Sequence, residues 1–195
     1  YSHRYDSETP LEETLQALVD IVRSGKALYV GLSRYPLAAA RFAFRYLAER
    51  DVPCLLFQDR YNIFDREPET SGLLTLSAEA GSGFVAFSPL AQGLLTDRYL
   101  NGIPENSRMA ADGSLRRDAL TDAVLERIRG LNDIARQRGQ TLAEMALAWL
   151  LRDTRVTSVI IGASSVAQIE DNLRALEHAS FSDDELAKID ALSRE

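Results

Sequence analysis

Short apolar runs alternate with longer amphipathic segments along the whole chain, and this alternation limits the fold more than any other feature of the sequence. The runs have little polar alternation, as expected of strands buried on both faces, and they cover residues 27–31, 54–57, 84–87 and 158–161. Strands that alternate with amphipathic helices form βαβ units around a parallel sheet. The sequence therefore predicts an α/β fold with a parallel sheet.

Between these runs, apolar residues recur at helical spacing, and capping signals mark where several helices begin. Thr9 and Glu12 predict a capping box at the start of the first helix, and Gly25 is expected to end it. Thr141 and Glu144 predict a second capping box. The further helices are expected over residues 36–50, 72–80, 122–138, 141–152 and 166–176, with a last one from residue 182.

No shift in composition and no internal repeat divides the chain, so residues 1–195 are expected to form one domain.

The helix over residues 166–176 is expected to bury Ile169, Leu173 and Leu176 on one stripe. The longest segment without periodicity covers residues 91–117. A loop of that length in a compact domain is usually functional or mobile.

Composition and charge exclude several classes of protein. Asp and Glu number 29 against 22 Lys and Arg, so the net charge of −7 leaves no positive excess for binding nucleic acid or an anionic membrane. No apolar run approaches the roughly 20 residues of a membrane-spanning helix. The single cysteine, Cys54, excludes an internal disulfide and a Cys-rich zinc site, and it favours a reducing, cytoplasmic setting.

Polar residues stand directly after the predicted strands: His3, Ser33, Gln58, Ser88 and Ser164. If the strands are parallel, these residues lie at their carboxyl ends, on the face where α/β barrels and open sheets place their sites. A lone serine or glutamine there is most often a helix cap, whereas five in register predict a site. The last of them leads into a helix N-terminus, where free amides and the helix dipole favour a phosphate.

Several motifs, taken together and in order, resemble the aldo-keto reductase superfamily. They are His3-Arg4-Tyr5-Asp6, Gly31-Leu32-Ser33-Arg34, Gln58 with Tyr61-Asn62, Ser88-Pro89-Leu90-Ala91-Gln92-Gly93-Leu94-Leu95, and Ile161-Gly162-Ala163-Ser164 followed by Gln168, Asp171 and Asn172. Within the superfamily, the chain is most similar to bacterial glyceraldehyde-3-phosphate reductase-type members, which are related to potassium-channel β subunits. The resemblance implies a TIM (β/α)8 barrel that binds NADPH without a Rossmann motif and reduces an aldehyde or ketone to an alcohol.

The resemblance also assigns roles to residues. It makes His3 the active-site histidine beside the substrate carbonyl. It places Ser33 and Gln58 on the nicotinamide carboxamide of NADP(H), with Arg34 as a further cofactor contact. The other implied cofactor contacts are Phe87, Ser88, Pro89, Leu90, Ala91 and Gln92 around the pyrophosphate, Arg98 and Arg108 on the phosphates, and Gly162, Ser164, Gln168, Asp171 and Asn172 at the adenosine end.

The resemblance covers about the second half of such a barrel, from the end of strand four to strand eight and the C-terminal helix. In the family, the tyrosine, lysine and aspartate that assist the histidine lie on earlier strands, so the chain alone is expected to be inactive. Two alternatives stay open: a dinucleotide-binding or channel-associated module without turnover, and a truncated product. The implied partners are a small carbonyl substrate and a second copy or a complementing N-terminal half. Nucleic acids and membranes are not expected as partners.

Overall fold

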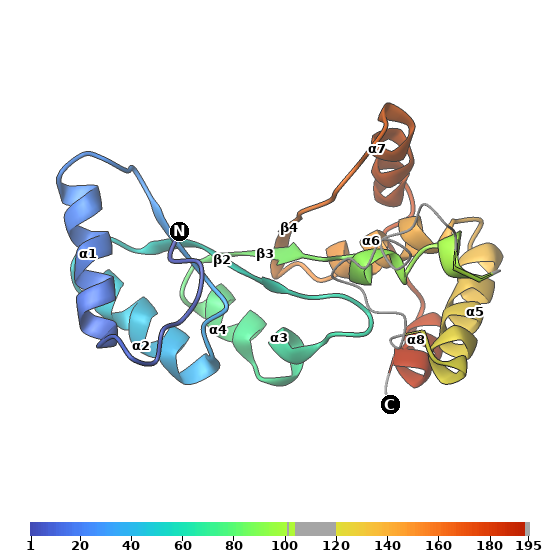
Figure 1. The fold of residues 1–195 in the computed structure, drawn as a ribbon, viewed down its shortest axis with the longest axis horizontal. Helices are drawn as coiled ribbons and strands as arrows, with labels where there is room; N and C mark the ends of the chain where they lie inside the picture. Colours follow the sequence, from blue (N-terminus) through green and yellow to red (C-terminus); the bar gives the residue numbers. More distant parts are fainter. Residues whose placement is uncertain (101, 104–119, 194–195) are drawn as a thin grey trace. The chain divides into compact units, whose positions relative to one another are not determined.

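The computed structural model describes residues 1–100, 102–103 and 120–193, in which strands and helices alternate along the chain (Figure 1). The strands are β1 (Val30–Ser33), β2 (Cys54–Arg60), β3 (Gly83–Phe87) and β4 (Val156–Val159). The α-helices are α1 (Leu11–Arg23), α2 (Leu37–Ala48), α3 (Glu67–Thr70), α4 (Leu73–Glu79), α5 (Asp122–Gln137), α6 (Leu142–Leu151), α7 (Val166–Leu173) and α8 (Asp183–Ser193). Short 3-10 turns are η1 (Ala91–Gly93), η2 (Asp97–Tyr99) and η4 (Arg174–Leu176).

The chain groups into two compact units. The first unit contains Tyr1–Arg60, Arg66–Phe87 and Thr154–Ser158. The second unit contains Tyr61–Asp65, Ser88–Asp153 and Val159–Glu195. None of the helices that the structure describes has the length and apolar character needed to cross a membrane.

The first unit is built on a parallel sheet, as the sequence predicts. The strand order is β1-β2-β3-β4, and β2 pairs in parallel with both β1 and β3. On the outer side of β1, Ser2 forms a parallel bridge with Leu32. Gly31 permits this close approach, because a Cβ atom there would lie 2.6 Å from the Tyr1 ring.

Aromatic side chains fill the core of the first unit. Phe57 of β2 lies between Phe44 of α2 and Phe84 of β3, with ring centroids 5.8 and 6.3 Å away. Leu15 and Val19 are the fully buried residues of α1, which packs against α2. The burial of one face of each helix against the strands explains why these amphipathic segments fold as helices here.

The core of the second unit surrounds α6. This helix buries eight of its ten residues, and its fully buried Trp149 packs against Tyr61 at a centroid distance of 5.4 Å. The predicted capping box at its start is confirmed, since Thr141 and Glu144 each bind the other's backbone N–H. Helices α5 and α8 pack against each other, and α5 also packs against α6.

The capping box predicted for α1 is wrong. The helix begins at Leu11 after Pro10, and no side chain caps it. The Thr9 hydroxyl instead donates a hydrogen bond to Asp6 Oδ2 at 2.6 Å. A local Asp–Thr turn has therefore taken the hydroxyl that the helix N-terminus would use. The end of the helix is as predicted, with Gly25 at φ +73° in the left-handed region.

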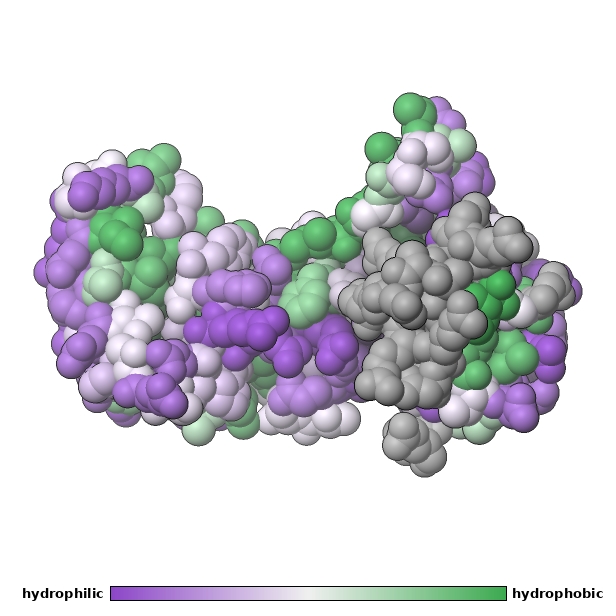
Figure 2. All heavy atoms as spheres, viewed as in Figure 1, coloured by the Kyte–Doolittle hydropathy of each residue, from purple (hydrophilic) through white to green (hydrophobic). Residues whose placement is uncertain are grey.

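The burial predicted for the helix over residues 166–176 is also wrong. The segment forms α7 followed by η4, and no residue of α7 is buried. Its apolar side chains are exposed, with exposed fractions of 45% for Ile169, 55% for Leu173 and 62% for Leu176. Figure 2 shows apolar atoms on the visible surface of this helix. Apolar periodicity identified the helix but not whether its stripe is covered.

Strand positions differ from the predictions by two or three residues. β1 lies at 30–33 and β4 at 156–159, whereas the apolar runs cover 27–31 and 158–161. β2 continues through Gln58 and Asp59 to Arg60 because these polar residues still pair with β3. The short helix α3 has too few residues for a periodic signal and was not predicted.

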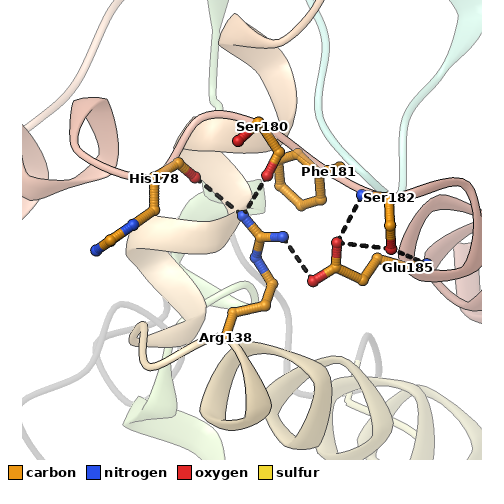
Figure 3. A pocket seen from close by; sticks show the side chains of 6 residues that line it. All are labelled: Arg138, His178, Ser180, Phe181, Ser182 and Glu185. Atoms are coloured by element: carbon orange, nitrogen blue, oxygen red, sulfur yellow. Dashed lines mark hydrogen bonds and ion pairs between the residues drawn. The ribbon is translucent and has the colours of Figure 1, made fainter.

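A pocket of about 430 Å³ on the second unit is built around one arginine (Figure 3). The Arg138 side chain is 7% exposed and pairs with Glu185 at 2.7 Å. It also donates hydrogen bonds to the backbone carbonyls of His178 and Ser180, and its guanidinium lies 3.7 Å from the centroid of the Phe181 ring. These contacts join the end of α5 to the start of α8.

The stability of the second unit should depend on the charge of Glu185. The N–H of Ser182 and then the Arg138 guanidinium lower the pKa of this carboxyl group from its ordinary value of 4.5. A carboxyl with a lowered folded-state pKa stabilises the fold above 4.5 and loses that contribution as the pH falls through the folded-state pKa. We expect the stability advantage of the wild type over Glu185→Gln to shrink at acid pH. Urea unfolding at a series of pH values measures it, and a constant difference would contradict the expectation.

Candidate functional site

Three predicted site residues of the first unit lie beside one another toward the carboxyl ends of neighbouring strands. Ser33 pairs with Gln58 in the β1–β2 register. The N–H of Ser33 donates to the carbonyl of Ser2 at 3.0 Å, which places His3 directly after the residue that bridges to β1. The prediction that His3, Ser33 and Gln58 share one end of a parallel sheet agrees with this register.

The Ser33 hydroxyl is buried without a hydrogen-bond partner. The residue is 2% exposed, and its Oγ finds no partner among the described residues. Its neighbour Gln58 is half-buried and His3 is exposed. A buried hydroxyl left unsatisfied costs about 1–3 kcal/mol, so a group that binds it from outside would recover that free energy.

An ion pair lies beside this row. Arg34 Nη1 lies 3.3 Å from Asp59 Oδ1, and the Asp59 side chain is 6% exposed. Burial raises the pKa of the Asp59 carboxyl, while the N–H of Arg60 at 2.7 Å and the Arg34 guanidinium favour its ionised form. Asp59 therefore orients Arg34, a predicted cofactor contact. The sequence pattern alone assigns no role to Asp59, because it does not show the ion pair with Arg34.

Left-handed backbone conformations concentrate at predicted site residues. Among the described residues, five that are not glycine have positive φ: Arg34, Asp51, Ser88, Ala91 and Gln92. Four of the five were predicted as cofactor contacts. Such conformations cost roughly 1–3 kcal/mol each and cluster at ligand-binding and active sites. No periodicity in the sequence reveals them.

The side chain of Asn62, which belongs to one of the family motifs, holds the loop after β3 in the second unit. Asn62 Nδ2 donates to the carbonyl of Ser88 at 3.0 Å. Pro89 is buried, and Leu90 packs against the cluster of Leu147, Ala148 and Ala175. Phe87, the last residue of β3, pairs with Arg60 in the first unit. These contacts hold the start of the loop, Ser88 to Leu90, in place.

Of the two arginines predicted to bind the phosphates, the structure describes one. Arg98 lies in η2 with an exposed side chain, and its N–H donates to the Thr96 hydroxyl at 3.2 Å. Arg108 lies outside the described residues. Neither role is tested by these contacts, so both stay predictions.

The start of α7 brings together the residues predicted for a phosphate and the adenosine end. Ser165 caps the helix by accepting from the Gln168 N–H, and Gln168 Oε1 accepts from the N–H of Ser164 at 2.7 Å. Gly162 and Ser164 are exposed. The side chain of Gln168 thus already occupies one of the amides that were expected to be free for a phosphate.

Asp171 binds an arginine that sequence reasoning did not single out. Its carboxylate pairs with Arg174 one turn further along, and Arg174 also pairs with the buried Glu144 of α6 at 2.9 Å. Asn172 is half-buried in the same helix. Glu144 was recognised only as a capping residue, because nothing in its spacing indicates the contact with Arg174.

The predicted residues therefore fall into separate groups. The first unit holds His3, Ser33, Arg34, Gln58 and Phe87. The second unit holds the loop Ser88 to Gln92, Arg98, and the group around α7. Within each unit the residues come together as described. The remaining candidate, Arg108, has no described position.

Comparison with known proteins shows the same family over nearly the whole chain. The aldo/keto reductase family matches residues 1–194. An L-glyceraldehyde 3-phosphate reductase of Escherichia coli K12 is 51% identical over 194 residues, which are 97% of this chain and 56% of the relative. A probable voltage-gated potassium channel subunit beta of Arabidopsis thaliana is 37% identical over 181 residues, which are 91% of this chain and 55% of the relative.

A solved structure supports the fold. A crystal structure of the thermostable aldo-keto reductase Tm1743 with the inhibitor epalrestat matches 97% of this chain and 57% of its own, with a TM-score of 0.70 and 30% identity. The predicted fold class is confirmed: the chain is a partial (β/α)8 barrel of the aldo-keto reductase type. It spans about half the length of the curated relatives that it matches. With the family matched over residues 1–194, the chain belongs to the aldo/keto reductase family.

Proposed function

We propose that the protein reduces a small aldehyde or ketone to an alcohol with NADPH as the reductant. The observation that carries the proposal is the buried Ser33 hydroxyl, which has no partner among the described residues and lies in register with Gln58. A hydroxyl and a primary amide side by side can bind both the carbonyl and the amino group of a carboxamide. These residues therefore fit the nicotinamide end of the cofactor.

The residues of the chain would each perform a limited task. When bound, the reduced nicotinamide supplies a hydride to the carbonyl carbon. Ser33 and Gln58 hold the carboxamide and so set the orientation of the ring. His3, one residue beyond the bridge to β1, would donate a hydrogen bond to the substrate oxygen, where negative charge develops. The family resemblance places the proton donor, a tyrosine, outside the residues that match this chain.

The second unit offers residues for the rest of the cofactor. Positive φ at Ser88, Ala91 and Gln92 turns this loop in a way that suits close approach to a pyrophosphate. The polar residues of α7 suit the adenosine end. An exposed arginine such as Arg98 can donate to phosphate oxygens. A contact with the 2′-phosphate, which NADPH carries and NADH lacks, would favour NADPH. The family match over both units supports treating residues 1–195 as parts of one domain.

The substrate we propose is a phosphorylated triose aldehyde, as in the name of the E. coli relative. The test uses the intact protein, in which these residues are joined to the earlier strands that the family resemblance implies. It measures oxidation of NADPH with L-glyceraldehyde 3-phosphate and with unphosphorylated glyceraldehyde. Faster turnover of the phosphorylated aldehyde supports the proposal. Binding of NADPH without turnover of either aldehyde would favour the second candidate below. We place the activity in the cytoplasm, which suits a chain whose one cysteine is a buried free thiol.

The Gln58→Leu substitution tests the carboxamide contact. We expect it to weaken NADPH and NADH by the same factor, about tenfold, because the carboxamide is common to both cofactors. Calorimetric titration of the intact protein measures both affinities. Gln137→Leu, at an exposed position at the end of α5, is the matched control and should change neither. Unchanged affinity in Gln58→Leu would remove Gln58 from the site.

A second candidate is a dinucleotide-binding subunit that associates with another protein and does not depend on turnover. The 37% identity to a protein named as a probable potassium channel subunit beta favours it. The histidine at position 3 favours the reductase instead, since related channel-type proteins can carry asparagine at that place. A His3→Asn variant that binds NADPH normally but loses turnover would assign the chemistry to this histidine.

A further inference from the structure

A buried glutamate of α6 holds the arginine that also holds Asp171. The Glu144 side chain is 8% exposed, and its Oε1 accepts a hydrogen bond from Arg174 Nε at 2.9 Å. The same guanidinium donates to Asp171 through its Nη2 group. The second oxygen of Glu144 accepts from the N–H of Thr141 at 2.8 Å, so both carboxylate oxygens are engaged.

This chain of contacts matters because α7 has little apolar packing. None of its residues is buried, and in the following η4 turn it is Ala175, at 1% exposed, that packs on Leu147 and Ala148 of α6. The ion pair between Arg174 and Glu144 therefore links α6 to the segment that carries Asp171. A buried carboxylate with both oxygens bonded cannot shift without losing hydrogen bonds.

Arg174 also balances the charge of two carboxylates. Its hydrogen bonds to Glu144 and then to Asp171 raise the pKa of the guanidinium, which stays charged. If Arg174 moved away, Asp171 would present an unpaired negative charge on α7. Asp171 would then also lose the hydrogen bond that holds its carboxylate in place.

We propose that Glu144 is a positioning residue, which acts through Arg174 to hold Asp171 and α7 in the arrangement that binds the adenosine end of the cofactor. The inference rests on the function proposed above, because it names a further residue for that same site. Glu144 itself lies on α6, and among the described residues its carboxylate binds Thr141 and Arg174, neither of which is predicted to contact the cofactor. Its effect on the ligand therefore passes through one side chain.

The first test is Glu144→Gln in the intact protein. The amide removes the negative charge and keeps an oxygen that can accept from Thr141, so the helix cap is preserved. The probes are the two halves of the cofactor, an adenosine bisphosphate and nicotinamide mononucleotide, titrated separately by calorimetry. We expect about tenfold weaker binding of the adenosine half, in line with the loss of one charge-assisted contact, and unchanged binding of the nicotinamide half.

Glu185→Gln is a matched control from the same unit. Glu185 also stands three residues after a capping serine, Ser182, and also pairs with an arginine, Arg138. It makes no contact with α7 among those described. We expect this variant to melt earlier but to bind both halves as the wild type does. Equal weakening of the adenosine half in both variants would show a general stability effect and overturn the proposal.

Coupling between sites gives a second measurement. If Glu144 acts through Asp171, then Asp171→Asn and the double variant with Glu144→Gln should bind the adenosine half equally weakly; additive losses would overturn the inference.

Should Glu144→Gln fail to fold, Arg174→Gln removes the same ion pair at a half-exposed side chain. If the wild type binds neither half, the proposed function fails and takes this inference with it. If the wild type binds both and Glu144→Gln binds equally well, only the inference fails.

Discussion

Replacement of Arg138 by methionine is expected to destabilise the protein by about 3 kcal/mol, the largest stability effect of any single substitution considered. The guanidinium pairs with Glu185 and donates to the carbonyls of His178 and Ser180 and to the Gln140 side chain. Removing one partner of a buried ion pair costs about 3–5 kcal/mol, since the other groups stay behind without a partner. Glu185 is 27% exposed, so water can reach it and the lower end of that range applies.

The measurement is urea unfolding of the intact protein, with Arg129→Met as the control. Arg129 also pairs with a glutamate, Glu126, at 3.1 Å, but both side chains are at least half exposed. Exposed pairs contribute about 0–1 kcal/mol, so the control should lose little. Similar losses in the two variants would mean that the contacts of Arg138 do not hold α5 and α8 together.

Residues 1–195, produced as a separate polypeptide, are expected to show no carbonyl reduction. The family resemblance assigns proton donation to a tyrosine that no tyrosine of this sequence matches. Tyr61 and Tyr99 are fully buried, and the hydroxyl of the buried Tyr35 is bonded to Ser2. A positioned general acid contributes about 10²–10⁴-fold, so its loss alone would take turnover close to background.

A chimera provides the positive control. The N-terminal portion of the E. coli relative, to which the resemblance assigns the earlier strands, is placed before Tyr1. We expect the chimera to oxidise NADPH with an aldehyde and the separate polypeptide to be inactive. Equal turnover by both would show that the proton donor lies within the 195 residues.

The same polypeptide is expected to associate. Apolar side chains are exposed before β1, where Leu28 is 82% exposed and Tyr29 67% exposed. The apolar stripe of α7 is exposed in the second unit. Exposed strand edges and apolar patches promote pairing with another chain. Size-exclusion chromatography with light scattering should show dimers or larger species, and a monodisperse monomer would contradict this expectation.

Local signals predicted each described strand and each described α-helix except α3, and they failed where side chains had a choice of partner. The box at Thr141 and Glu144 formed as predicted, whereas the hydroxyl of Thr9 bound Asp6 instead of the helix. Both pairs have the spacing of a capping box. A nearby acid before the helix, which the spacing rule does not consider, decides the difference.

The sequence predicted the site residues at the strand ends but not the contacts that support them. Parallel pairing was enough to bring Ser33 beside Gln58. The ties from Asn62 to the Ser88 carbonyl and from Glu144 to Arg174 join residues 26 and 30 positions apart, and no periodicity links them. Such contacts depend on how the elements pack, so a single sequence does not indicate them.

The unsatisfied hydroxyl of Ser33 lowers the stability of the fold, although we assign it to cofactor binding. Alanine at that position would remove a buried polar group that gains nothing in the free protein, and the fold would become more stable. A search for thermostable variants of this protein would therefore favour the loss of this serine, and with it the group that we assign to the cofactor. Mutations that stabilise a protein often reduce its activity for this reason, because functional sites keep groups that the fold alone does not need.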